Sequence, residues 1–239
     1  MIIIKKSTWS AALLLVATNI FVAGCSDAPG PSREQLVAEY PSVEQGSTRQ
    51  ENIEIMCPFV RMLERSGLFD ETFANQGDLD ISTSELTSAA QEFGCAVLEC
   101  GTVAATAAVG QPGGSGVDIE RLHEAAGIAH DCGLTFEYGG TQVSDDRRDA
   151  TITRLGELAD EQGHLVYDDI LQVKLETCDG EGVGITTAGR TETKLIFAYL
   201  GGVDNGFVTL DDVSSFLHAE MPSVKTRFMV DARQLGKVR

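Results

Sequence analysis

Apolar residues recur at helical spacing along most of this chain, and no stretch shows the sustained alternation typical of a half-exposed strand. Ile152, Leu155 and Leu158 would share one face of a helix, and Val166, Ile170 and Val173 one face of the next. A third, strongly apolar helix is predicted over residues 190–200. The pattern therefore predicts an all-α fold, with about seven helices in one domain.

Capping residues and breakers divide the chain further. Ser82 and Glu85 have the spacing of a capping box, and the helix they begin should run towards Val109, where a glycine-rich segment follows. Asp118 is predicted to open another helix that reaches His130 and Asp131.

Residues 75–85 and 202–212 are similar to calcium-binding EF-hand loops. The second lacks a side-chain ligand at its first position, Gly201, and the first is out of register. We interpret both as turns followed by capped helices, the second capped by Thr209.

The N-terminus has the form of a bacterial export signal. Lys5 and Lys6 precede an apolar run over residues 11–22 that is too short for a comfortable membrane span. The tetrapeptide Val22-Ala23-Gly24-Cys25 resembles the lipobox of bacterial lipoproteins, which implies a lipidated Cys25 as the new N-terminus. We therefore expect residues 1–24 to be removed and the protein to be exported to the cell envelope, anchored by lipid at Cys25.

The remaining chain is expected to comprise a flexible tether over residues 25–52 and a helical domain over residues 53–239. The whole sequence has a formal net charge of −18, and loss of the two lysines of the signal makes the rest more acidic still. Nucleic acids and anionic lipids need a basic face, so the charge argues against both as partners. Membrane contact is expected through the lipid anchor only.

Five cysteines follow Cys25, in a compartment that permits disulfides. Because five is odd, at least one thiol is left over, and Cys57 is the natural candidate. Cys95 and Cys100 should point to different sides of one helix, so we expect them to pair with Cys132 and Cys178 rather than with each other. The sequence leaves the connectivity open.

Cys57 stands directly before Pro58, which is favoured at the first position of a helix. A thiol at such a helix start, with Arg61 one turn along, would have its anion stabilised by free backbone N–H groups and the helix dipole. This thiolate would suit a metal ligand or a nucleophile. The simpler interpretation is that Cys57 is a small buried apolar residue.

The order of local motifs resembles the haem-thiolate peroxidase family, which includes chloroperoxidase and the unspecific peroxygenases. The first resemblances are Met56-Cys57-Pro58 and the following helix, and the helix start at Ile81-Ser82-Thr83-Ser84-Glu85-Leu86. Val117 to Thr135 resembles the family's Glu-His-Asp phrase, with Ala129-His130-Asp131 at its centre. Two later phrases correspond to residues 155–171 and 213–222.

This resemblance implies that Cys57, before Pro58, is the thiolate ligand to the iron of one haem b. It makes Glu192 the acid–base residue that moves a proton between the two oxygens of hydrogen peroxide, and His130 the residue that orients Glu192. The implied activity is peroxide-dependent oxidation of a small organic or halide substrate.

Three positions depart from the family pattern. Met56 replaces a proline, and Ala129 and Gly133 replace the side chains that bind a divalent cation beside the haem. We therefore expect no metal at that second site.

Taken singly, His130 could be a helix-end histidine and Glu192 an ordinary first-turn acid. The alternative to an enzyme is a non-catalytic envelope lipoprotein that keeps the helical fold as a binding module.

Overall fold

The computed structural model describes residues 28–76, 80–111, 116–130 and 132–239, and these residues are mainly α-helical. The helices are α1 (Arg33–Glu39), α2 (Pro58–Arg65), α3 (Asp70–Gln76), α4 (Thr83–Glu92), α5 (Val97–Gly110), α6 (Asp145–Leu158), α7 (Tyr167–Gly180), α8 (Thr187–Tyr199), α9 (Gly202–Asn205), α10 (Leu210–Leu217) and α11 (Ala232–Lys237), with short 3-10 turns η1 (Pro41–Val43) and η2 (Leu122–Glu124). The mainly helical prediction is confirmed, with more and shorter helices than expected.

Two very small antiparallel sheets accompany the helices. Strand β1 (Asp80–Ile81) pairs with β2 (Val117–Asp118), and β3 (His164–Leu165) pairs with β4 (Val208–Thr209). Each strand has only two residues, which is too few to show as alternation in the sequence. Each sheet ties two interhelical loops together.

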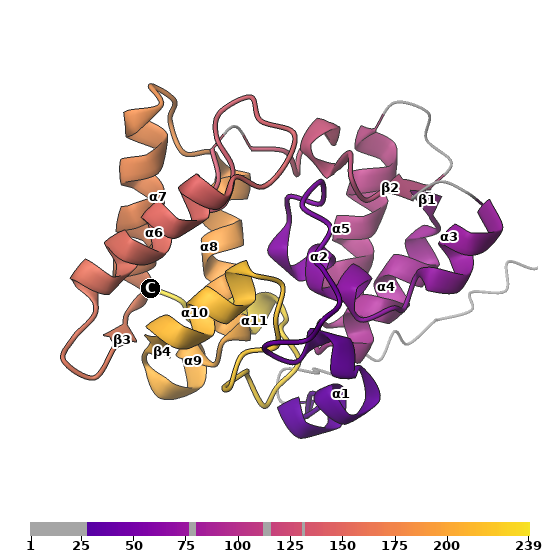
Figure 1. Cartoon of the computed structure of the whole chain (residues 1–239), viewed down its shortest axis with the longest axis horizontal. Coiled ribbons are helices and arrows are strands. Elements are labelled where there is room, and N and C mark those ends of the chain that lie inside the picture. The colour runs from indigo at the N-terminus through magenta and orange to yellow at the C-terminus, as the bar shows by residue number, and fades with distance from the viewer. Residues whose placement is uncertain (1–27, 77–79, 112–115, 131) are drawn as a thin grey trace, which may run out of the picture.

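The helices form two groups on either side of the molecule. Figure 1 shows α2 to α5 on one side and α6, α7, α8 and α10 on the other. One hydrophobic cluster nevertheless runs through both groups, from Leu36 near the N-terminus to Val238 at the C-terminus. Helix α2 contacts α4 on its own side and α10 on the other. It therefore lies at the junction between the groups.

The expected tether over residues 25–52 is wrong for the part that the structure describes. Ser32 caps α1 through a capping box, and Leu36 and Val43 are buried in the core. Two apolar side chains packed in this way give the segment a reason to fold that its polar composition hides. The expected signal, residues 1–24, and the expected lipidation site, Cys25, lie outside the described residues. No helix within the described ranges combines the length and apolar character needed to cross a bilayer.

The single helix expected from Ser82 to Val109 is two helices. Helix α4 ends at Glu92, and Gly94 adopts a positive φ of 97°. The backbone of Cys95 then pairs with that of Val230 as an isolated β-bridge before α5 begins. This break brings Cys95 to Cys100, with Cα atoms 6.1 Å apart, and the two form a disulfide. The other disulfide joins Cys132 to Cys178. The expected pairing was therefore wrong, because it assumed an unbroken helix.

The helix expected from Asp118 to Asp131 is also absent from the described part of that stretch. The backbone N–H and C=O of Asp118 bond the buried side chain of Gln111, and Asp118 itself pairs with β1. Only η2 follows, and the chain reaches His130 as a loop. Tertiary hydrogen bonds have overridden the local helical pattern here.

Candidate active site

Cys57 is the N-cap of α2, as the Cys-Pro pair predicts. Its φ and ψ of −71° and 116° are extended, its carbonyl accepts the N–H of Arg61 at 2.9 Å, and Pro58 occupies the first turn. The backbone N–H groups of Phe59 and Val60 lie near the sulfur and lower its pKa, although neither forms a capping hydrogen bond to it. Cys57 is the free cysteine of the described residues and is half-buried. It is thus available as a ligand or a nucleophile.

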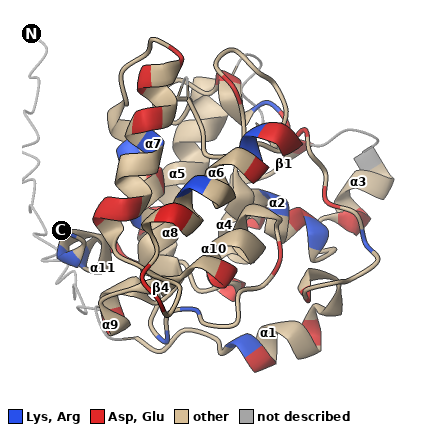
Figure 2. Cartoon of the chain, turned by 60° about the vertical axis from the view of Figure 1, so that its left-hand side comes forward, with Lys and Arg blue, Asp and Glu red and all other residues tan. Residues whose placement is uncertain are grey.

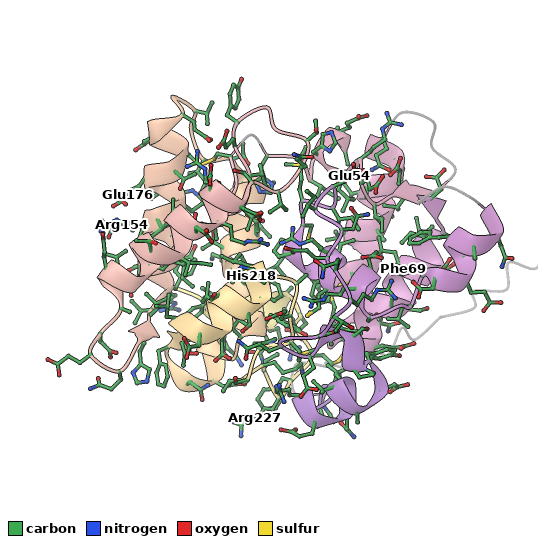
Figure 3. All side chains as sticks on the ribbon, viewed as in Figure 1. Glu54, Phe69, Arg154, Glu176, His218 and Arg227 are labelled. Carbon is green, nitrogen blue, oxygen red and sulfur yellow. A yellow bond between two sulfur atoms is a disulfide. The ribbon has the colours of Figure 1, made fainter. Side chains whose placement is uncertain are left out.

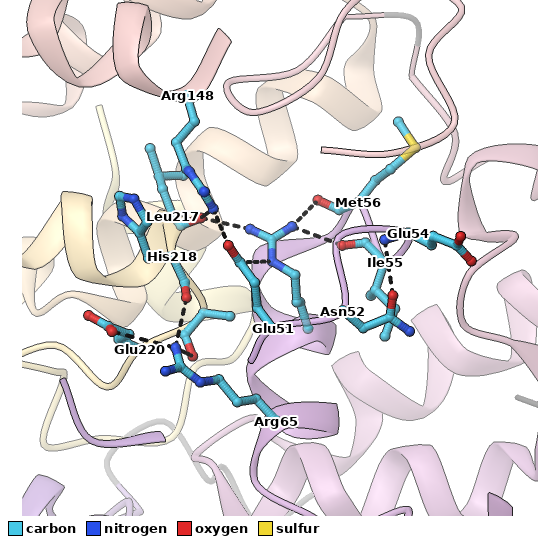
Figure 4. A network of polar contacts seen from close by, with 12 residues as sticks. Glu51, Asn52, Glu54, Ile55, Met56, Arg65, Arg148, Leu217, His218 and Glu220 are labelled. Atoms are coloured by element: carbon cyan, nitrogen blue, oxygen red, sulfur yellow. Dashed lines mark hydrogen bonds and ion pairs between the residues drawn. The ribbon is translucent and has the colours of Figure 1, made fainter. Parts of the chain in front are cut away.

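Arg61 holds the loop before Cys57 in place. Its guanidinium is completely buried and donates to the carbonyl oxygens of Ile55 at 2.8 Å and Leu217 at 2.7 Å, with a longer contact to Met56. Glu51 pairs with it at 2.8 Å and also with Arg148 at 2.5 Å (Figure 4). This cluster ties the loop to the end of α10 and the start of α6.

The thiol of Cys57 has a raised pKa. Burial is the largest cause, and the negative charge of Glu192 acts in the same direction. The N–H groups of Val60 and Phe59 and the charge of Arg61 oppose this rise but do not overcome it. The expectation of a stabilised thiolate is therefore wrong for the free thiol. Glu192 is thus one of the charged groups whose field acts on the Cys57 thiol.

Glu192 lies in the second turn of α8, and one of its oxygens has two partners. Oε2 lies 3.1 Å from Nε2 of His130 and accepts a hydrogen bond from Nζ of Lys174 at 2.6 Å. Lys174, on α7, is completely buried. The structure thus brings together the two side chains that the resemblance pairs, His130 and Glu192. It adds a lysine that the sequence reasoning missed.

The pKa of Glu192 lies well below the ordinary carboxyl value. Burial pushes it upward, but the positive charge of Lys174 and the contacts with His130 outweigh burial. Glu192 therefore remains a carboxylate at neutral pH. The lowered pKa makes it a weak base, which readily gives up any proton that it accepts.

The loop that carries His130 is fastened to α7 next to Lys174. Cys132, two residues after His130, forms its disulfide with Cys178, one turn after Lys174. The ring of Phe136 packs on His130 with centroids 5.4 Å apart and lies under Lys174 Nζ. A Cβ at Gly133 would stand 2.1 Å from this ring, so the loop as built excludes any larger residue there. Asp131 lies outside the described residues.

Two hollows stand out among the described residues, and neither is lined by Cys57 or Glu192. One, of about 770 Å³, is an open apolar groove along α5 that includes Val97, Leu98 and Val109. The other, of about 740 Å³, lies beside α1 and includes Tyr40 and Glu92. No group of three or more metal-binding side chains occurs within the described ranges.

The residues missed by sequence reasoning are the buried charges. Lys174 sits in a predicted helix between Val173 and Leu175, where an isolated lysine would normally reach solvent. Glu51 fell in the expected tether. The sequence signal for the Lys174–Glu192 pair was slight. It consisted of one lysine among the apolar residues of a predicted helix and one acid in the apolar helix that follows. Comparison with protein-family models and with curated proteins finds no match.

Proposed function

We propose that this protein is a haem-thiolate peroxidase of the chloroperoxidase-like helical fold, exported behind a lipoprotein signal and anchored at Cys25 in the bacterial envelope. The observation that carries the proposal is the contact between His130 and Glu192, two side chains distant in sequence. Glu192 bonds His130 at 3.1 Å while its charge reaches Cys57 at the helix start. This is the arrangement that the motif order implies.

The donor set fits a haem iron. Cys57 is a free thiol at a helix start, where nearby backbone N–H groups and Arg61 lower its pKa, and this supports a role as a thiolate ligand to iron. Binding of a cation at the sulfur would replace the proton whose loss burial now opposes. Bound there, haem would supply the redox chemistry that cleaves the O–O bond of hydrogen peroxide. Pro58 would support the ligand by fixing the first turn of α2.

The remaining work falls to Glu192, Lys174 and His130. Glu192, held ionised, would accept the proton of one peroxide oxygen and return it to the other, so that water leaves. His130 would keep the carboxylate of Glu192 oriented. Lys174 would keep that carboxylate negatively charged while peroxide approaches. A small organic molecule or a halide would then be oxidised.

A spectrum of protein purified from haem-supplied cells tests this proposal. We expect a thiolate-type, red-shifted Soret band after reduction and addition of carbon monoxide, lost in Cys57→Ala. Peroxide-dependent turnover should fall at least about a hundredfold in Glu192→Gln. Glu176→Gln, which alters an exposed ion pair with Arg154, is the matched control and should keep full activity. A histidine-type band, or no Soret band, would refute the proposal.

A second candidate, a non-catalytic binding module on the same anchored fold, is favoured by two observations. The two described hollows lie away from Cys57 and Glu192, and Lys174 occupies the carboxylate that would handle peroxide. For this candidate we expect no turnover in the wild-type chain, and Cys57→Ala should leave ligand capture unchanged.

A further inference from the structure

The basic residues of this acidic chain are unevenly distributed. From Cys25 to Glu220 there are 11 Lys and Arg against 35 Asp and Glu, whereas residues 221–239 hold five basic residues and one acid. That acid, Asp231, is buried and caps α11 by accepting from the N–H groups of Arg233 and Gln234. The C-terminal segment is therefore positive within a negative protein.

The two sets of basic residues also differ in their partners. Eight basic side chains of the helical body make ion pairs: Arg49, Arg61, Arg65, Arg121, Arg147, Arg148, Arg154 and Lys174. Within the described residues, none of the basic side chains of 221–239 makes one: Lys225, Arg227, Arg233, Lys237 and Arg239. Figure 3 shows the contrast between Arg154, beside Glu176, and Arg227, which projects from the edge of the molecule. Lys225 is held by the carbonyls of Pro31 and Thr226, whereas the other four are exposed and their charge is left for a partner.

Residues 225–229 of this segment lie beside the first described residues of the chain. Met229 donates to the carbonyl of Ala28 at 3.0 Å, Pro29 forms a bridge with Phe228, and Gly30 donates to Arg227 at 3.0 Å. Lys225 donates to Pro31 at 2.6 Å. In Figure 2 the basic residues of α11 lie beside the C-terminus. We call residues 28–31 together with residues 224–239 the anchor face.

The anchor face also carries apolar groups beside its charges. Val224 is 41% exposed, and Phe228 is partly exposed under the guanidinium of Arg227, whose carbon lies 4.9 Å from the ring centroid. Arginine over an aromatic ring, next to an exposed valine, is a combination suited to the boundary between headgroups and acyl chains. Two acids nearby are already engaged, since Glu99 accepts from Ala232 and Asp204 from Thr226.

The partner is inferred from the proposed lipidation of Cys25, on which this inference rests. Two residues separate Cys25 from Ala28, and an extended chain covers at most about 10 Å between their Cα atoms. A lipid on Cys25 would hold the anchor face against the bilayer. We propose that the anchor face docks on anionic phospholipid headgroups, with Arg227, Arg233, Lys237 and Arg239 contacting phosphate and Phe228 entering the interface.

This inference revises the expectation of contact through the lipid anchor alone. Net charge described the molecule as a whole, whereas attraction to a charged surface falls off within about 10 Å. The four exposed cations within residues 227–239 therefore count for more at this face than acids on the far side. Each basic residue close to an anionic bilayer contributes about fivefold to binding.

Hydrogen exchange on vesicles tests the proposal with the full chain, purified after export whether or not it is acylated. Vesicles of phosphatidylcholine alone are compared with vesicles containing about 30% phosphatidylglycerol. We expect slower exchange over residues 224–239 on the anionic vesicles only, and loss of this protection at high salt. Helix α6, which lies elsewhere on the surface, is the internal reference.

The triple variant Arg227→Glu/Arg233→Glu/Lys237→Glu should lose the protection, with vesicle affinity reduced at least about a hundredfold in any unacylated fraction. Arg121→Glu/Arg147→Glu/Arg154→Glu makes the same change of charge at residues outside the face and should retain it. Equal exchange on both vesicle types, or protection centred on other residues, would overturn the proposal. Protection by RNA but not by vesicles would assign the face to nucleic acid and would also overturn it.

Discussion

Two buried ionic clusters meet at the candidate site, and they are built differently. In the Arg61 cluster, a buried guanidinium bonds three main-chain carbonyls besides Glu51, so several segments depend on one side chain. In the Glu192 cluster, Lys174 and His130 converge on a single carboxylate oxygen, and the contacts are between side chains. The first arrangement fixes backbone. The second controls where a proton can reside.

We expect the largest effect from Arg61→Met, which removes the centre of the first cluster. Removal of the guanidinium leaves the carbonyl of Ile55 without its donor and that of Leu217 with only a longer contact from Arg148. It also removes one partner of Glu51, so we expect a loss of about 3–5 kcal/mol in the free energy of unfolding. Urea denaturation measures it. Arg154→Met, at an exposed ion pair, should cost no more than about 1 kcal/mol. If the two variants lost the same free energy of unfolding, the Arg61 cluster would stabilise the fold no more than an exposed ion pair does.

The Glu192 cluster is tested by a double-mutant cycle. Glu192→Gln or Lys174→Met alone leaves a charge without its partner in a buried place, and each should cost about 2–3 kcal/mol in urea denaturation. The double variant should recover much of that loss, because two neutral groups replace two charges. Additive losses would mean that the 2.6 Å contact carries no coupling.

The third test measures how the stability contributed by the Glu192 cluster depends on pH. Because the pKa of Glu192 is lowered in the folded protein, the unfolded chain takes up a proton first as the pH falls. The stabilisation is therefore complete above the ordinary carboxyl range, near 4.5, and is lost below it. Between about pH 6 and pH 3, the midpoint temperature of thermal unfolding should fall less steeply in Glu192→Gln than in the wild-type chain. Parallel curves would contradict the assignment.

The smallest effect is expected at the thiol. Since the charge of Glu192 contributes to the raised pKa of Cys57, Glu192→Gln should speed alkylation of Cys57 by a few-fold at about pH 8 in the haem-free protein. Burial, the larger cause, remains, so the rate should stay below that of a free thiol. Mass spectrometry of iodoacetamide adducts measures both rates. A slower reaction in the variant would reverse the sign of the inferred interaction.

The same contrast explains which parts of the fold and of the candidate site could be predicted from the sequence. Cys57, Pro58 and the helix they begin follow from local rules, since a proline fixes its own φ and a cap needs only neighbouring N–H groups. Local spacing also gave α6, α7, α8 and α10. Motif order suggested the pairing of His130 with Glu192, and the 3.1 Å contact agrees with it. Their roles remain predictions.

What could not be read depends on tertiary partners. The break at Gly94, which produces the Cys95–Cys100 disulfide, accompanies pairing with Val230 far along the chain. Lys174 looked like a surface lysine until α8 supplied its carboxylate. The strands β1 to β4 have two residues each, and their pairing was not visible in any local pattern. Long-range contacts of this kind leave almost no trace in local spacing.

The bridge between Pro29 and Phe228 has a consequence for the order of folding. The segment around Pro29 finds this hydrogen-bonding partner only after residue 228, 199 positions later, has been made. A chain stopped before residue 227 would lack that partner, however well its helices had formed. Helices α1 to α10 all precede residue 227, so this contact forms after every one of them has been made.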